Sequence, residues 1–197
     1  MNVLVVYAHP NPLSFNHALL ESVAAGLKEA GHDVRVKDLY AEKPKVTLDA
    51  EDFQGILAGR VPEDIRREQA EVAWAEGLVF VYPVWWLSMP AILKGWIDRV
   101  FLNGFAFEIA PEGPRGLLRH RKAQIVMTTG GLERDYAEGI GRQLLTEPMT
   151  GGVLRFCGIA EVSTKVFYGV PSASENQRKA MLAEAFALGR SFYNSGQ

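Results

Sequence analysis

The chain has 197 residues, of which 48% are hydrophobic and 22% are charged. That length fits one domain of ordinary size, so we expect a single domain over residues 1–197. The hydrophobic content excludes a disordered protein, which cannot bury enough apolar surface to fold. The formal net charge of −2 excludes a chain that binds nucleic acid through its overall charge.

Cysteine content and the N-terminal segment bear on location. The single cysteine, Cys157, cannot form an internal disulfide and fits a reducing compartment. The N-terminus leads straight into the apolar run 3–7, so we expect no signal peptide. No apolar run approaches the roughly 20 residues that span a bilayer. These features predict a cytoplasmic protein without membrane insertion, and no histidine spacing suggests a metal site.

Short apolar runs alternate with helical patterns along the chain. The apolar runs predict five strands, at 3–7, 34–36, 78–82, 123–127 and 162–168. Helical spacing predicts one helix that ends near Gly31, one over Ile65–Trp74, one with Pro90 at its first position and one that begins at Ser174. The connection from Leu39 to Pro62 is longer than usual, which predicts a surface excursion.

This alternation predicts an α/β fold, a doubly wound parallel sheet with helices on both faces. The Rossmann order and the flavodoxin order of strands both fit the pattern. In either order, ligands bind beyond the carboxyl ends of the strands. We therefore expect the site in the loops that follow Tyr7, Tyr82 and Met127.

The first of these loops, residues 8–16, contains no glycine. A dinucleotide-binding Rossmann turn needs glycines there, because only they let the backbone approach a pyrophosphate. The loop instead brings His9, Ser14 and Asn16 to a helix N-terminus, a position that binds anions. The alternative is that Ser14 only caps the helix and the prolines shape the turn.

The second loop carries two adjacent tryptophans, Trp85 and Trp86. Large rings in a loop must be covered. Either a flat aromatic cofactor lies over them, or one ring caps the core and the other packs at a subunit interface. The third loop, 128–131, has two glycines that expose backbone N–H groups, although an ordinary glycine turn also fits. Together the three loops favour a planar ligand that carries a phosphate.

Several motifs occur together and in order. They are His9, Ser14-Phe15-Asn16, the run from Pro90 to Trp96, Phe105-Ala106-Phe107, Thr128-Thr129-Gly130-Gly131 and Phe156-Cys157-Gly158. With them the chain resembles, over nearly its whole length, the NAD(P)H:quinone oxidoreductase family of DT-diaphorase-like flavoproteins. The resemblance implies a flavodoxin-like five-stranded parallel sheet, a bound flavin and a homodimer with active sites at the subunit interface.

The resemblance also assigns residues. Those implied to bind the flavin are His9, Ser14, Phe15, Asn16, Pro83, Val84, Trp85, Trp86, Leu87, Thr128, Thr129, Gly130, Gly131 and Tyr136, with Gln54 and Arg178 at the far end of the cofactor. The implied cofactor is FAD, with FMN as the alternative. Substrate would face Trp86, together with Phe107 and Ile109 from the partner subunit. Animal relatives have two tyrosines at these last two positions, so the pocket here is more apolar.

The implied reaction is a ping-pong, two-electron hydride transfer from NAD(P)H through flavin N5 to a quinone or similar acceptor, azo and nitro compounds included. Tyr136 would be the catalytic residue, stabilising negative charge near flavin N1 and O2. In the family a histidine often follows this tyrosine by about five residues, but Gly141 stands there in this chain. The alternative function is a regulatory flavoprotein subunit, a peripheral partner of a potassium-efflux transporter.

Overall fold

The computed structural model describes residues 1–136 and 141–193. Its strands are β1 (Asn2–Tyr7), β2 (Asp33–Asp38), β3 (Gly77–Pro83), β4 (Phe107–Ala110), β5 (Gly113–Gly116), β6 (Lys122–Thr128) and β7 (Val162–Phe167). Its α-helices are α1 (Phe15–Glu29), α2 (Leu39–Glu42), α3 (Ala50–Leu57), α4 (Glu63–Trp74), α5 (Ala91–Val100), α6 (Gly141–Met149) and α7 (Glu175–Arg190). Short 3₁₀-helices η1 (Glu133–Tyr136) and η3 (Val170–Ser172) and a π-helix η2 (Thr150–Arg155) complete the chain.

The central sheet is parallel, with strand order β2-β1-β3-β6-β7. This is the flavodoxin order, and it confirms the fold that the resemblance implies. Tyr7 lies opposite Val81, and Pro83 lies opposite Thr128. Because the connections turn to opposite sides at β1 and β3, the ligand crevice of such a sheet lies beyond the carboxyl ends of these two strands.

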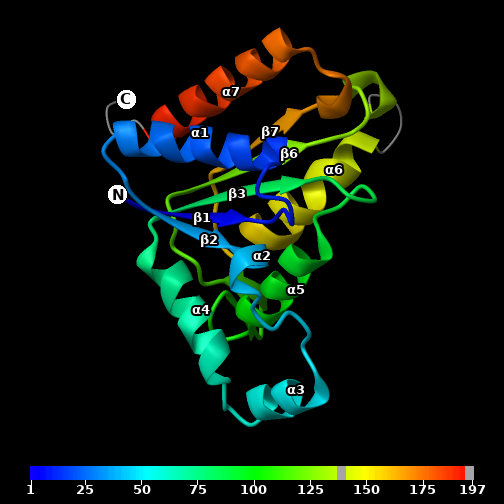
Figure 1. The fold of residues 1–197 in the computed structure, drawn as a ribbon. Helices are drawn as coiled ribbons and strands as arrows, with labels where there is room; N and C mark the ends of the chain where they lie inside the picture. The colour runs from blue at the N-terminus through cyan, green and yellow to red at the C-terminus, as the bar shows by residue number, and fades with distance from the viewer. Residues whose placement is uncertain (137–140, 194–197) are drawn as a thin grey trace.

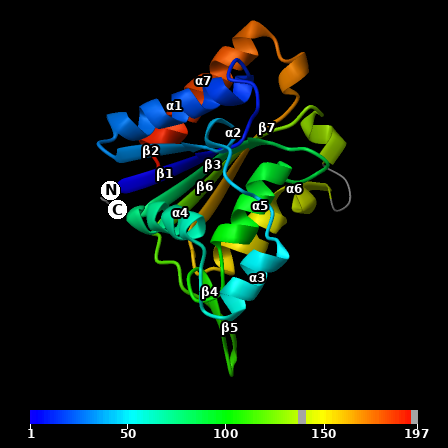
Figure 2. The same ribbon diagram turned by 60° about the horizontal axis from the view of Figure 1, so that its bottom comes forward.

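Helices α1 and α7 cover one face of the sheet and lie side by side in Figures 1 and 2. Two glycines permit the close approach. A Cβ at Gly26 would lie 2.1 Å from the carbonyl oxygen of Phe186, and one at Gly189 would lie 2.2 Å from that of Val23. The capping box predicted at Ser174 is present at the start of α7. Phe192 is buried and lies just beyond the end of this helix.

The other face packs against α4, α5 and η2. Phe80 and Tyr82 of β3 point toward these helices, while Val79 and Val81 point toward α1 and α7. Such alternation is expected of a strand that is buried on both faces. Trp96 of α5 is fully buried on this face.

No helix in the described residues is long and apolar enough to cross a membrane.

A buried ion cluster fixes the excursion to this second face. Arg99 of α5 is only 4% exposed and donates hydrogen bonds to Asp52 (3.0 Å), to Asp64 (2.6 Å) and to the carbonyl of Lys45 (3.0 Å). Lys45 also pairs with Asp52 at 2.8 Å. Lys45 and then Arg99 hold the pKa of Asp52 below its usual value, and Arg99 does the same for Asp64.

Several elements differ from the sequence predictions. The expected excursion carries two helices, α2 and α3, and the chain adds the β4–β5 hairpin, α6 and η2. Pro90 caps α5 rather than occupying its first turn, because its ψ of 146° is extended. The last strand of the sheet ends at Phe167, one residue earlier than predicted.

Candidate active site

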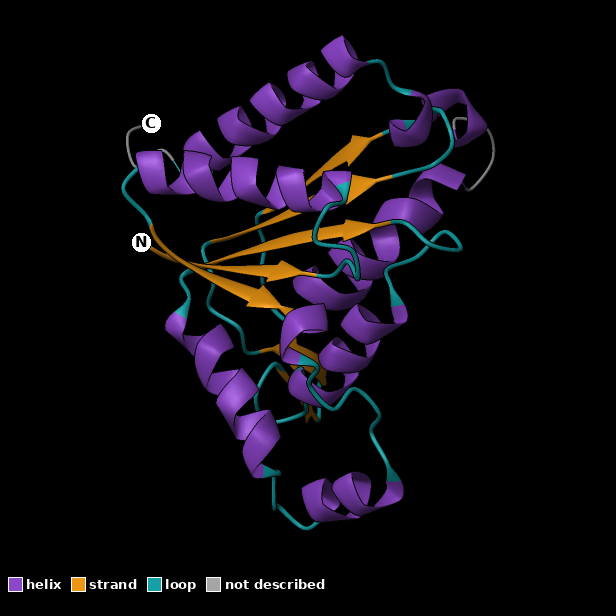
Figure 3. Ribbon diagram, viewed as in Figure 1, coloured by secondary structure: helices purple, strands orange, loops and turns teal. Residues whose placement is uncertain are grey.

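Three loops begin side by side at the carboxyl edge of the sheet, toward which the strand arrows in Figure 3 point. Backbone hydrogen bonds extend the sheet beyond β1 and β3. Ala8 N–H donates to Val81 O at 3.1 Å, and Val84 N–H donates to Thr128 O at 2.8 Å. The loops after β1, β3 and β6 therefore start from neighbouring positions, as the strand order requires.

The loop after β1 ends at the N-terminus of α1. Ser14 caps the helix, because its Oγ accepts a hydrogen bond from the N–H of His17 at 3.2 Å. The same Oγ lies 3.4 Å from the Tyr7 hydroxyl. The N–H groups of Phe15 and Asn16 have no partner within the helix, and the first turn has no acidic side chain. This helix end can therefore accept an anion.

Asn16 joins the first loop to the third. Its side chain is 5% exposed, and its Nδ2 donates to Thr128 Oγ1 at 2.8 Å. Its Oδ1 is buried without a hydrogen-bond partner among the described residues. Leaving such an oxygen unpaired costs roughly 1–3 kcal/mol, so the position favours a ligand that donates a hydrogen bond. Beside it, the ring of Phe15 packs against the core under α1.

His9 opens the first loop and reaches toward the second. Its Nδ1 lies 3.1 Å from the nitrogen and 3.2 Å from the oxygen of the Asn11 backbone. Its ring centroid is 6.2 Å from that of Trp85. Partial burial lowers the pKa of His9, which favours the neutral ring at neutral pH. With Nδ1 bonded to Asn11, the Nε2 side of the ring remains for a ligand.

The loop after β3 contains a strained turn. Trp85 and Ser88 exchange two backbone hydrogen bonds of 2.9 and 3.0 Å. The residues between them, Trp86 and Leu87, have left-handed φ angles of 51° and 59°. This conformation costs a non-glycine residue on the order of 1–3 kcal/mol, and such strain collects at functional sites.

The same turn exposes its aromatic rings. Trp86 is 100% exposed and Trp85 is 41% exposed, whereas Pro83 and Val84 anchor the turn in or against the core. Trp86 projects fully into solvent and does not cap the core, whereas Trp85 is partly covered. The two rings form a surface that a flat ligand or a second chain can cover.

The third loop is held by backbone and hydroxyl groups. Thr128 and Thr129 are buried, and Thr129 Oγ1 donates to Gly131 O at 2.8 Å. Gly169 N–H donates to the same oxygen at 2.7 Å. Gly130 is exposed, and a Cβ there would meet no atom within 4 Å. Hydrogen bonds thus hold the loop on its buried side, and Gly130 leaves its exposed side open.

Tyr136 lies over this third loop. A Cβ at Gly131 would be 2.9 Å from Tyr136 Oη, so the hydroxyl packs directly on that glycine. The ring lies 5.8 Å from that of Tyr168. Gly141 begins α6. A Cβ built at Gly141 would lie 3.3 Å from the carbonyl oxygen of Tyr136, so Gly141 faces the Tyr136 backbone. The position therefore supplies no imidazole to the tyrosine.

Gln54 and Arg178 lie apart. Gln54 is exposed on α3, where it lines a hollow with Arg60 and Pro62. Figures 1 and 2 both place α3 far from α1 and α7. Arg178 is exposed in the first turn of α7. Within one chain, the structure does not bring these two side chains to a common place.

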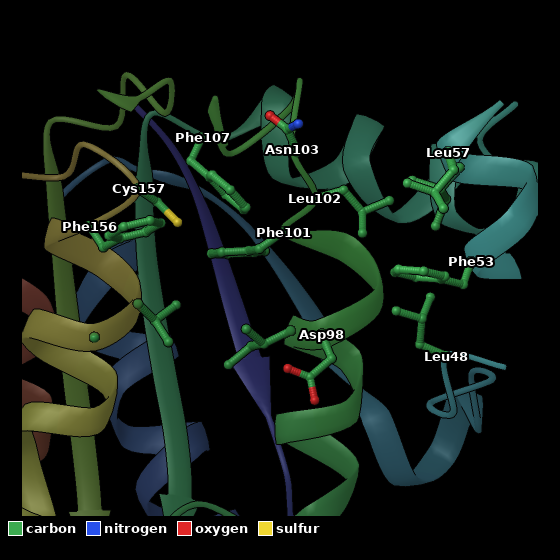
Figure 4. A pocket seen from close by; sticks show the side chains of 14 residues that line it. Leu48, Phe53, Leu57, Asp98, Phe101, Leu102, Asn103, Phe107, Phe156 and Cys157 are labelled. Carbon is green, nitrogen blue, oxygen red and sulfur yellow. The ribbon is translucent and has the colours of Figure 1, made fainter. Parts of the chain in front are cut away.

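Phe107 and Ile109 are also separate from the three loops. They lie on the β4–β5 hairpin, at the end of the molecule that Figure 2 brings forward. Ile109 is 66% exposed, while Phe107 packs on Phe156 with ring centroids 5.2 Å apart. Phe107 lines a groove of about 530 Å³ (Figure 4), in which none of the described lining residues comes from the three loops. Within one chain, the three loops and this groove are therefore separate.

Known proteins share this architecture. A model of the flavodoxin-like fold family matches residues 1–188. The chain is 36% identical over 202 residues to the ribosyldihydronicotinamide dehydrogenase [quinone] of Homo sapiens, covering 92% of this chain and 87% of that protein. The chain belongs to the NAD(P)H:quinone oxidoreductase family. Its resemblance to that family is confirmed, and the protein is an oxidoreductase.

Other relatives agree with this membership. An uncharacterized NAD(P)H oxidoreductase of Haemophilus influenzae is 34% identical over 183 residues, covering 92% of this chain and 91% of that protein. The solved NAD(P)H:quinone oxidoreductase from Methanothermobacter marburgensis superposes with a TM-score of 0.89 at 31% identity, covering 98% of this chain and 99% of that chain. An azoreductase from Bacillus anthracis str. Sterne gives 0.80 at 26% identity, covering 97% and 99%.

The sequence predictions gave no site role to Phe53, Leu57 and Phe156, which line the groove. Phe156 belongs to the Phe-Cys-Gly motif, so a signal was present. Phe53 and Leu57 are spaced four residues apart, which places them on one helical face within the expected excursion. That spacing was the available sign of α3 and of its apolar side.

Proposed function

We propose that the protein is a cytoplasmic, flavin-dependent NAD(P)H:quinone oxidoreductase. The observation that carries this proposal is the convergence of an open helix N-terminus, the unpaired Asn16 Oδ1 and the exposed turn at Trp86 on one sheet edge. A flavin fits this set, because a phosphate suits the helix end and a flat ring suits the indoles. Relatives named NAD(P)H dehydrogenase [quinone] support the electron donor and acceptor.

Each loop has its own part in this proposal. His9, Ser14, Phe15 and Asn16 hold the phosphate and the ribityl chain. The turn 83–87 lies along the ring system, and the loop 128–131 meets its pyrimidine end. When bound, the flavin supplies the two-electron chemistry, by taking up hydride from NAD(P)H and giving it to the acceptor. The turn leaves one face of the site open, where nicotinamide and acceptor bind alternately in a ping-pong order.

The proposed cofactor is FAD, with FMN as the alternative. Arg178 is exposed near the start of α7, whereas Gln54 lies on the distant α3. Gln54 can therefore contact the far end of the cofactor only from a second copy of the chain. Chromatography of the flavin released by heat identifies the cofactor directly, after the purified protein has been incubated with both.

We propose Tyr136 as the catalytic residue. Its hydroxyl, packed on Gly131, is placed to donate a hydrogen bond to negative charge that develops at the pyrimidine end of the cofactor. Removing one donor of this kind typically slows a reaction about 100-fold or more. Tyr136→Phe should therefore slow reduction by NADPH in stopped-flow measurements and leave flavin affinity unchanged. Unaltered reduction kinetics would contradict the assignment.

The separation of Phe107 and Ile109 from the three loops supports a homodimer. In this arrangement, the loops of one copy face Phe107 and Ile109 of the other, which covers the exposed Trp86. Light scattering should give twice the mass of the chain. Mixing Tyr136→Phe with Phe107→Glu, each with low activity alone, should restore activity, because a mixed dimer contains one intact site. No recovery in a proven mixed dimer would contradict a shared site.

Visible spectroscopy tests the function as a whole. The protein purified with flavin should show flavin bands that bleach on anaerobic addition of NADPH and return when menadione is added. Bands that persist with both NADPH and NADH would favour the flavin-binding regulator. Absence of flavin binding after incubation with FAD or FMN would overturn the proposed site.

A further inference from the structure

The end of β7 is tied to the third loop by backbone hydrogen bonds. Thr129 N–H donates to Phe167 O at 3.0 Å, and Val170 N–H donates to Thr129 O at 3.1 Å. Tyr168 lies between these two bonded positions in the chain. Its backbone is therefore held at a fixed place relative to the loop 128–131.

The short helix η1, which ends at Tyr136, is held differently. None of its residues is buried. Leu132 N–H donates to Asp135 Oδ2 at 2.7 Å and Asp135 N–H donates to Leu132 O at 2.9 Å, so these bonds close the turn on itself. The start of the turn is anchored on Gly169, where a Cβ would lie 2.6 Å from Leu132 Cδ2. The position of Tyr136, at the other end, depends on what its side chain contacts.

The Tyr136 side chain contacts both Gly131 and Tyr168. A Cβ at Gly131 would lie 2.9 Å from Tyr136 Oη and 3.1 Å from Cε2, so the hydroxyl edge of the ring rests on the glycine. The ring centroid is 5.8 Å from that of Tyr168, and the two planes are tilted by 37°. An aromatic pair of this kind favours its packed geometry about two- to tenfold. Gly141 adds no side chain to this support.

We propose that Tyr168 is a positioning residue, whose ring keeps the Tyr136 hydroxyl on Gly131. The inference rests on the proposed function, in which that hydroxyl donates a hydrogen bond to the cofactor. The support runs in one direction, because the third loop fixes Tyr168 and Tyr168 in turn fixes Tyr136. Without the ring of Tyr168, the Tyr136 side chain can rotate away from Gly131, and the donor leaves the pyrimidine end of the site.

The midpoint potential of the bound flavin tests the proposal without turnover. A donor at Tyr136 stabilises the negative charge of the reduced cofactor, so Tyr136→Phe should lower the potential. Tyr168→Ala should lower it by a smaller amount, and Tyr168→Phe, which keeps the ring, should retain the native value. Added to Tyr136→Phe, Tyr168→Ala should have no further effect, because no donor is left to position. Additive effects of the two substitutions would overturn the inference.

Stopped-flow reduction by NADPH gives the size of the effect. Tyr168→Ala should slow reduction by up to about tenfold, less than the loss expected for Tyr136→Phe. Tyr168→Leu keeps an apolar side chain without a ring, so it should behave in the same way and serves if the alanine variant does not fold. Tyr193→Ala is the matched control and should keep the native rate. Tyr193 is a partly buried tyrosine whose ring lies 5.7 Å from Arg121, at the amino edge of the sheet.

Nuclear magnetic resonance of the flavin-free protein separates the inference from the proposed function. Cross-relaxation between the Tyr136 ring protons and the α protons of Gly131 should be present in the native protein and in Tyr168→Phe. In Tyr168→Ala it should weaken about twofold or more. An unchanged signal would overturn the inference while the function stands. A weakened signal in a protein whose flavin NADPH does not reduce would overturn the function, while the positioning of Tyr136 stands.

Discussion

The two faces of the sheet are packed in different ways. On one face, α1 and α7 approach so closely that neither Gly26 nor Gly189 has room for a Cβ. On the other, the ion cluster around Arg99 joins the excursion to α5, and a groove stays open beside α3. The closely packed face supports the loops from behind. The face joined through charges keeps a groove open beside α3, so the two faces differ in how completely they are packed.

The largest expected effect comes from Arg99→Ala, which tests whether charges hold the groove face. Asp52 would be left buried with Lys45 as its remaining partner, and breaking a buried pair costs roughly 3–5 kcal/mol. Urea unfolding at pH 7 measures the loss. A loss below about 1 kcal/mol would show that apolar packing alone holds this face.

The same variant should also change how the free energy of unfolding depends on pH. Because Lys45 and Arg99 lower the pKa of Asp52, its contribution to stability is present above the ordinary value of 3.8 and is lost as pH falls through the lowered pKa. Arg99→Ala should therefore show a flatter decline in the free energy of unfolding below pH 5 than the native protein. Parallel declines would contradict the pairing.

Gly26→Ala tests the other face. The added methyl group would lie 2.1 Å from the carbonyl oxygen of Phe186, so α1 and α7 must separate. Overpacking of this kind costs about 3 kcal/mol, which thermal unfolding can detect. Gly152→Ala in η2 is the matched control. A Cβ built at Gly152 would lie 3.6 Å from its nearest neighbour, the carbonyl oxygen of Glu147. The free energy of unfolding should therefore stay the same or rise by up to about 1 kcal/mol.

Replacing Trp86-Leu87 by Asn-Gly tests whether the strain serves binding. These residues favour the left-handed turn, so the flavin-free protein should gain about 1–2 kcal/mol in urea unfolding. Flavin affinity, measured by fluorescence titration, should fall because the exposed indole is lost. Unchanged affinity would remove the turn from the proposed cofactor site.

His120 offers the smallest effect, on the α4 side of the sheet. It is buried, and its Nε2 bonds to Val72 O at 2.9 Å. Burial lowers its pKa, so its contribution to stability is present above the ordinary value of 6.5 and is lost as pH falls below it. His120→Gln should reduce the shift in urea midpoint between pH 7.5 and 5.5. The pKa values of His9 and His32 are also lowered, so these two residues keep their part of the midpoint shift in the variant.

The sheet and its closely packed face follow from the sequence, because buried strands and amphipathic helices leave periodic apolar patterns. The face of the sheet that carries the groove was less predictable from the sequence. Phe53, Ile56 and Leu57 of α3 line a groove rather than the core, so no buried stripe marks that helix. Pro148 lies within α6, and Gly151 and Gly152 within η2, where these residue types normally indicate an end.

For the site, the strand order alone places the three loops together. Their residues were predictable because the carboxyl ends of parallel strands meet at one edge. The separation of Phe107 and Ile109 from those loops depends on where the β4–β5 hairpin lies, which periodicity does not report. The role proposed for each residue follows from the resemblance rather than from periodicity.

The unpaired Asn16 Oδ1 has a consequence for how much folded protein a cell retains. Asn16 bonds to Thr128, so a ligand that completes its hydrogen bonds stabilises two neighbouring loops together. Ligand at 100 times its dissociation constant adds about 2.7 kcal/mol to the free energy of unfolding. Where proteases degrade the unfolded form, the amount of the chain should then follow the supply of its ligand.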